Sequence, residues 1–275
     1  MSDPFDGANF FIGLAKEHAD NFNALELEFL ESEPYTMWSD FDSDTGLHHT
    51  RVKIVREVPK RLRGYASDAV KNIRDSLDQA MSAAVFGVTG KRKRHAHFPF
   101  GESEADLENS LWTEADKSAV PRSRKTRNCR DIPEELFDAI RFIKPYPHEG
   151  DQWWLKTLQK VSGPHKHGVA LTLGSALAVP AAQLELMETV GGPPTVSTQF
   201  HEWDATETEF VVATTKGLPP GGKLILSHPF HIAFDHPELK PFHAGTLIAR
   251  WGTRTEWIIA GLKKTVEMLV AERGG

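Results

Sequence analysis

Several closely spaced histidines in this sequence are candidates for binding a metal ion. The chain has 13 histidines, and His165 and His167 are separated by a single residue. On a strand, alternate residues point to the same face, so such a pair can bind zinc, iron or manganese together with a second pair, His228 and His231, and a carboxylate. The alternative, which we favour, is that these are ordinary surface or half-buried histidines. We therefore predict no metal site and no other cofactor.

Arg74 and Asp78 form a second candidate centre, four residues apart on a predicted helix. We predict that Lys166 and His167 approach this helix and complete a polar cluster with them. A cation can stabilise the charge of a phosphorane and an imidazole can transfer a proton, so the candidate catalytic residues are Arg74, Asp78 and His167. The alternative is an ion pair of Arg74 with Asp78 that only supports the fold.

Two basic clusters, GKRKRHAH and RSRKTRNCR, lie between positions 90 and 130. This segment has ten Lys or Arg and six Asp or Glu, a local charge of +4 that leaves −10 for the remainder of the chain. Such a segment can follow a phosphate backbone, although loops are commonly charged. The candidate anion-binding residues are Lys166, Asn72, Arg92 and Arg124.

The overall composition indicates which classes of protein this chain can belong to. The chain has 275 residues, a net charge of −6 and a hydrophobic content of 40%, which is typical of a globular protein. The sequence shows no membrane-length apolar run and no signal peptide, so we expect a cytoplasmic protein without membrane contacts. The single cysteine, Cys129, excludes an internal disulfide, and nearby arginines would lower its pKa if they lie close. P-loop, dinucleotide-binding and GxSxG motifs do not occur.

Helical spacing of apolar residues dominates the first half of the chain. It predicts helices over 8–31 and 62–88, of which the second is the core helix. Between them, a β-hairpin is predicted at about 34–58 with Gly46 in the turn. Asn72 falls on the side of the core helix opposite its apolar stripe, where exposure to solvent is expected.

The second half of the chain changes from helical to β patterning. Helices are predicted from Asp131 to about Ile143 and through 153–158. Short β-branched and aromatic runs beyond His167 predict an antiparallel sheet, and 255–271 predicts a closing amphipathic helix.

Together these elements predict an α+β fold. An N-terminal helical bundle carries the hairpin insertion, and an antiparallel sheet and a C-terminal helix follow. The predicted division is a helical region over 1–165 and a β region with the closing helix over 166–275, packed as one compact unit.

Several segments resemble a widespread family of uncharacterised bacterial proteins. The family has a helix of the form D-x-x-x-N-L-R-S-x-L-D-H, an FPI segment, a QPY segment and a D-K-H-R motif. The resemblance covers about residues 12–170, with Gln79 at the position of the helix histidine. It implies an outline of the fold and no particular reaction. The positions that match are Asp68, Asn72, Arg74, Ser76, Leu77 and Asp78 in the helix, Phe98-Pro99-Phe100, Pro145-Tyr146 and Lys166-His167.

The spacing around Arg74 also resembles the R-x(4–6)-H motif of HEPN-type helical ribonucleases. The resemblance implies metal-independent attack of a ribose 2′-hydroxyl on the neighbouring phosphate. In this sequence Gln79 occupies the histidine position and cannot shuttle protons near neutral pH. Another imidazole, such as His167, would have to take that role.

Three hypotheses of function follow. The preferred one is a non-catalytic binding or interaction module for an anionic partner, with RNA as a candidate. The first alternative is a HEPN-like ribonuclease of a defence or toxin system. The second is a metal-dependent enzyme that uses the C-terminal histidines.

Overall fold

The computed structural model shows the α+β fold that the sequence predicts. Contacts divide the chain into two compact units, neither of which is continuous in sequence. The first unit comprises Met1–Asn21, Gly64–Leu171 and Gly245–Gly275, and the second comprises Phe22–Arg63 and Thr172–Ala244. The structure describes residues 3–111, 129–147, 153–162, 173–177, 182–185, 197–200, 209–218, 223–226, 230–236, 238–239 and 242–274.

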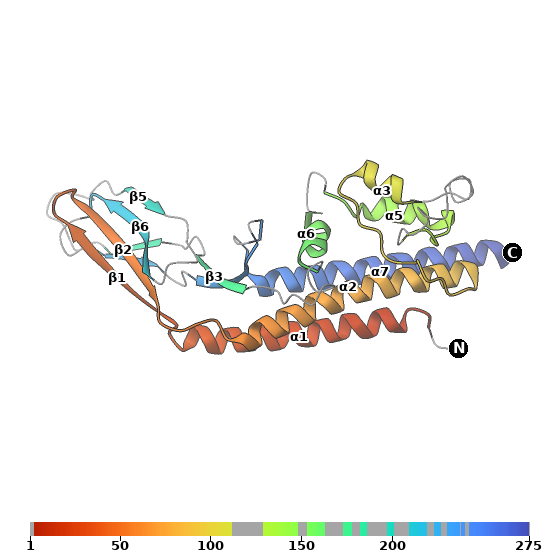
Figure 1. Cartoon of the computed structure of the whole chain (residues 1–275), viewed down its shortest axis with the longest axis horizontal. Coiled ribbons are helices and arrows are strands. Elements are labelled where there is room, and N and C mark those ends of the chain that lie inside the picture. The colour runs from red at the N-terminus through yellow and green to blue at the C-terminus, as the bar shows by residue number, and fades with distance from the viewer. Residues whose placement is uncertain are drawn as a thin grey trace. The chain divides into compact units, whose positions relative to one another are not determined.

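The framework of the first unit is formed by parts of three long helices: residues 6–21 of α1 (Asp6–Glu31), residues 64–89 of α2 (Lys60–Thr89) and residues 245–274 of α7 (Ala244–Gly274). In this unit they run side by side (Figure 1). The hydroxyl of Ser76 on α2 donates to the carbonyl of Ala8 on α1 at 2.8 Å. About three turns further along α2, a Cβ added to Gly87 would lie 2.4 Å from a methyl carbon of Val266 on α7. Glycine therefore allows α2 and α7 to approach closely at this point.

Helix α2 provides much of the core of the first unit. Its apolar residues from Ala66 to Val85 are almost completely buried, as helical spacing predicts. Burial also extends beyond the predicted stripe, because α2 contacts other segments on more than one side. Asn72, which was expected to face solvent, is buried.

Shorter helices follow α2 in the first unit. They are α3 (Glu104–Ser110), the 3-10 turn η2 (Glu134–Leu136), α5 (Phe137–Ile143) and α6 (Trp153–Ser162). The sequence analysis did not predict α3, whose N-terminus is capped by the Ser103 side chain accepting from the Asp106 amide at 3.1 Å. The helix predicted from Asp131 begins three residues later as η2 and becomes α-helical only at Phe137.

The largest sheet belongs to the second unit. It is antiparallel with the order β1-β2-β6-β5, formed by β1 (Tyr35–Asp42), β2 (Leu47–Ile54), β5 (Ser197–Phe200) and β6 (Glu209–Lys216). Gly46 makes the hairpin turn with a φ of 70°. Because β2 also pairs with β6, the hairpin belongs to the same sheet as strands from the later part of the chain.

Two smaller antiparallel pairs complete the described β structure. Strand β3 (Leu173–Leu177) pairs with β8 (Phe230–Phe234), and β4 (Ala182–Glu185) pairs with β7 (Lys223–Leu226). Helix α7 then begins at Ala244, earlier than the predicted start at 255. Its added turns bury Leu247, Ile248 and Trp251, at spacings typical of a helix. Among the described helices, none has the length and apolar character needed to cross a bilayer.

Candidate functional site

Arg74 and Asp78 lie close together, one turn apart on α2. The Arg74 Nε atom is 3.5 Å from Oδ2 of Asp78. The guanidinium carbon of Arg74 also lies 4.0 Å from the centre of the Phe100 ring, which places the cation over an aromatic face. Arg74 is only 9% exposed. Its charge is thus engaged inside the protein by a carboxylate and a ring.

Asp78 connects α2 to the segment that carries the FPF sequence. Its Oδ1 accepts a hydrogen bond from the Phe98 amide at 2.8 Å, and the His97 Nδ1 atom lies 3.6 Å from its Oδ2. Burial by itself would raise the pKa of Asp78, but the His97 imidazole, the Arg74 guanidinium and the backbone amide together lower it. The carboxylate therefore stays ionised and holds the segment against the helix.

Cys129 lies near the same cluster, and the environment of its thiol differs from the one that its charged sequence neighbours indicated. The thiol is buried, with its Sγ atom 3.9 Å from the His97 carbonyl oxygen. Burial, and then the negative charge of Asp78, raise the pKa of the Cys129 thiol to about 11 despite the opposing effect of Arg74. A nearby arginine does lower this pKa, but desolvation outweighs it, so the net shift of the Cys129 pKa is upward.

The Arg74–Asp78 cluster is less suited to catalysis than its residue types indicate. The cation is largely buried, and both oxygens of the carboxylate have neighbours within the protein. His97, with a side chain that is 43% exposed, is the member of the cluster most open to solvent. This arrangement fits a connection between α2 and the FPF segment better than a substrate site.

The other predicted members of that cluster lie outside the described residues. Lys166 and His167 are in the segment 163–172, so their predicted approach to Arg74 stays a prediction. Arg124 also lies outside the described residues, whereas Arg92 is exposed just after the end of α2.

Of the four histidines considered for a metal, only His231 is described; His165, His167 and His228 lie outside the described residues. In the second unit the rings of His231 and His243 are 6.1 Å apart. His243 Nε2 lies 2.6 Å from Oε2 of Glu26, and the other oxygen of Glu26 accepts the Ile232 amide at 3.1 Å. Within the described ranges, no group of three or more His, Cys, Asp or Glu side chains is placed to hold a metal ion.

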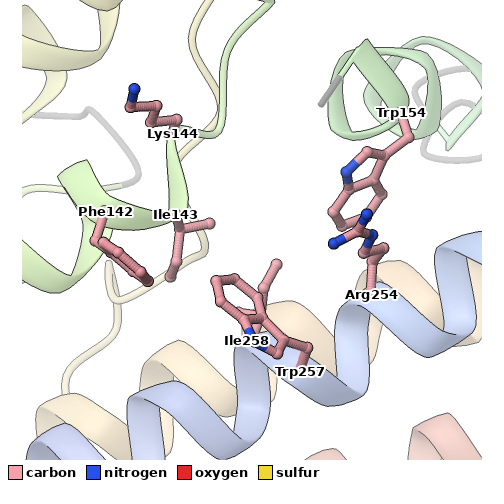
Figure 2. Close-up of a pocket in the computed structure, with 7 residues that line it drawn as sticks. All are labelled: Phe142, Ile143, Lys144, Trp154, Arg254, Trp257 and Ile258. Carbon is pink, nitrogen blue, oxygen red and sulfur yellow. The ribbon is translucent and has the colours of Figure 1, made fainter. Parts of the chain in front are cut away.

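A pocket of 440 Å³ opens in the first unit between the end of α5, the start of α6 and one face of α7. Figure 2 shows aromatic side chains on opposite sides of it and Trp257 on α7 between them. The rings of Phe142 and Trp257 are 5.9 Å apart with an angle of 35° between their planes. The residues that line the pocket are Phe142, Ile143, Lys144, Trp154, Arg254, Trp257 and Ile258.

The polar side chains of this pocket are all hydrogen-bond donors. Arg254 and Lys144 carry positive charge, and none of the seven lining residues is acidic. The Trp154 indole Nε1 is buried and has no hydrogen-bond partner, although an indole N–H normally finds an acceptor. Lys144 lies at the rim, with its side chain directed away from the centre (Figure 2). The pocket is therefore suited to an anionic ligand with an apolar or aromatic part.

Sequence reasoning did not identify this pocket. Its residues come from three helices that are distant in sequence, and the predicted closing helix began at residue 255, one residue after Arg254. One signal was present: Trp257 lies off the apolar stripe of that helix, where an exposed large aromatic is unusual.

Comparisons of the chain with models of known protein families, with curated proteins and with solved structures find no match.

Proposed function

We propose that this protein is a non-catalytic binding module for an anionic partner, with RNA as a candidate, and that the pocket beside Arg254 is where the partner's charge binds. The observation that carries the proposal is the composition of the lining: two cations, two indole N–H groups and no carboxylate. Arginine is well suited to phosphate and carboxylate groups because its planar guanidinium can donate two parallel hydrogen bonds.

The test is binding of the full chain to a short single-stranded RNA over a range of salt concentrations. Affinity should fall as salt rises, because bound phosphates release counterions. Arg254→Ala should weaken binding and reduce the salt dependence by about one phosphate contact. Lys264→Ala is the matched control, since Lys264 is an exposed cation on the same helix α7, outside the pocket lining. Binding that is absent, or equally strong in Arg254→Ala and the control, would reject the proposal.

The basic segment is a second surface for the same partner. Arg92 is exposed, so a phosphate backbone could reach it. If Arg92→Ala and Arg124→Ala weaken RNA binding while Arg254→Ala does not, the partner binds through the basic segment and the pocket has another role.

A HEPN-like ribonuclease is the alternative function, and one observation favours it. His97 provides an imidazole next to Asp78, the same carboxylate that contacts Arg74. An Arg and a His on one carboxylate are the residue types that metal-independent cleavage needs. The burial of Arg74 under Phe100 argues against it.

Cleavage of single-stranded RNA in the presence of a metal chelator tests this alternative. His97→Ala is the sharper variant, because His97 is partly exposed and its loss should leave the fold intact. Loss of cleavage in His97→Ala with an unchanged melting temperature would support the ribonuclease. An unaffected rate, or no cleavage by the wild-type chain, would exclude it.

A further inference from the structure

Two large aromatic rings are exposed to water at the mouth of the pocket. Phe142 is 71% exposed and Trp257 is 48% exposed, and the two rings lie next to each other. Exposed apolar surface of this kind, bordered by charged groups, is typical of a binding site. A planar ring that covers Phe142 or Trp257 would remove that surface from water and add stacking.

Apolar side chains form much of the rest of the lining. Ile143 and Ile258 are buried, and Trp154, only 3% exposed, lies on the α6 side of the pocket (Figure 2). The volume of 440 Å³ lies within the range of small-molecule sites, about 300–1,000 Å³. The pocket thus has room for a ligand the size of a single ring system with its substituents.

The polar groups of the pocket indicate which chemical groups the polar end of the ligand carries. Arginine, lysine and the indole N–H groups of the two tryptophans donate hydrogen bonds and cannot accept them, and the remaining lining side chains, Phe142, Ile143 and Ile258, are hydrocarbon. A ligand must therefore bring the acceptors. The buried Trp154 Nε1, which lacks an acceptor, would be satisfied by an oxygen of such a ligand.

We propose that this pocket binds a nucleotide unit, with its heteroaromatic base against Trp257 and Phe142 and its phosphate held by Arg254, with Lys144 at the rim. This inference rests on the proposed anion-binding function and names the chemical class of the ligand. A small inorganic anion would leave both exposed rings uncovered. An uncharged aromatic ligand would make no use of the positive charge that Arg254 and Lys144 bring to the pocket. The nucleotide unit can be a free mononucleotide or one residue of a single-stranded RNA.

Calorimetric titration of the full chain with three probes tests the ligand class. AMP carries both the ring and the phosphate, ribose 5-phosphate carries only the phosphate, and adenosine carries only the ring. We expect AMP to bind at least about fivefold more tightly than ribose 5-phosphate, which is the smallest gain that stacking of one base typically gives. Equal affinities for AMP and ribose 5-phosphate would overturn this inference and leave the anion-binding function standing. Failure of AMP, ribose 5-phosphate and RNA to bind would reject both.

Two variants distinguish the contribution of the Trp257 ring to binding from that of the Arg254 charge. Trp257→Leu keeps an apolar side chain but removes the aromatic face. The affinity for AMP should therefore fall to that for ribose 5-phosphate, and the affinity for ribose 5-phosphate should not change. Arg254→Gln should weaken both phosphate ligands by about tenfold or more. Phe10→Leu is the control for an exposed aromatic ring on α1, outside the pocket lining, and should have no effect. If Trp257→Leu leaves AMP binding intact, the base does not stack in this pocket.

A riboadenylate hexamer distinguishes the two sources of the nucleotide. Six equivalent bases raise the apparent affinity by about sixfold through statistics alone. A larger gain, abolished by Trp257→Leu, assigns the pocket to one residue of a single strand. A gain within the statistical factor assigns it to a free mononucleotide. Hexamer binding that Trp257→Leu leaves unchanged would overturn the inference.

Discussion

The guanidinium carbon of Arg74 lies 4.0 Å from the centre of the Phe100 ring. This contact, with the Asp78 ion pair, fixes a residue whose sequence context resembles a catalytic arginine. Since the cation is buried, its main role is to compensate the nearby carboxylate and to hold the FPF segment against α2. The sequence motif thus has a physical explanation that needs no reaction.

Replacement of Arg74 by alanine should destabilise the protein. It would leave Asp78 buried without its cation and remove the contact with Phe100. Loss of one partner of a buried ion pair costs roughly 3 kcal/mol, so a decrease of that order in the free energy of unfolding is expected. Urea denaturation measures it, with Lys71→Ala, an exposed residue of the same helix, as the control. Equal stability of the two variants would show that the Arg74 contacts contribute little.

Asp78 should make the stability of the protein depend on acid pH. Its pKa in the folded state lies below the ordinary value of 3.8 for an aspartate, so folding favours the ionised form. The stabilisation is fully present above about pH 4 and is lost as the pH falls below the unfolded value through the folded one. The stability difference between wild type and Asp78→Asn should therefore shrink as the pH decreases below 4. Asp68→Asn, at an exposed site on α2, provides the comparison.

Cys129 should react slowly with thiol reagents in the native protein. Its pKa is about 11 instead of 9.0, so at pH 8 the thiolate fraction is roughly 100-fold lower than in the unfolded chain. Because the chain has one cysteine, the rate of reaction with a chromogenic disulfide reports on this site alone. Similar rates with and without denaturant would contradict the assigned burial.

Local patterning was enough to predict most of the fold. The helical spacing around Ile73 and Leu77 and the turn at Gly46 each reflect interactions within a short segment, and both predicted elements are present. Pairing of β2 with β6 was not predictable in this way, because no local signal specifies which distant strand completes a sheet. The short helix α3 was missed since its cap, Ser103, lies in a segment dominated by charge and turn residues.

The candidate site was predicted less well than the fold. The pairing of Arg74 with Asp78 follows from their spacing on one helix. The pocket brings together Lys144, Trp154 and Arg254 from three separate helices, and spacing along the chain carries no information about that convergence. Likewise, the pKa of Cys129 depends on burial, which its charged sequence neighbours do not reveal.

Replacement of Lys144 should raise the stability of the protein and weaken its binding of the ligand. It is the C-terminal capping residue of α5 and has a φ of 49° and a ψ of 64°, the left-handed region that favours glycine. Lys144→Gly should relieve this strain and raise the free energy of unfolding by up to about 1 kcal/mol. The same change removes a cation from the pocket rim, so affinity for ribose 5-phosphate should decrease modestly. Thermal unfolding and calorimetry of one variant measure both effects, and a loss of stability would contradict the strain argument.

Glu26 should be essential to the stability of the second unit. Its side chain is buried on α1 and accepts hydrogen bonds from the Ile232 amide at 3.1 Å and from His243 Nε2 at 2.6 Å. Glu26→Ala would leave the buried Ile232 amide without an acceptor, which costs about 1–3 kcal/mol, and would also remove the partner of His243. Denaturation monitored by circular dichroism should show a loss of at least this size.

Glu28→Ala is the matched control for Glu26→Ala, since Glu28 is exposed on the same helix only two residues away. Both substitutions change helix propensity and net charge equally, so the difference between them isolates the buried hydrogen bonds. Amide exchange at Ile232 provides a local readout, because its protection depends directly on the Glu26 carboxylate. Unchanged protection of that amide in Glu26→Ala would show that β8 is held in place by other contacts.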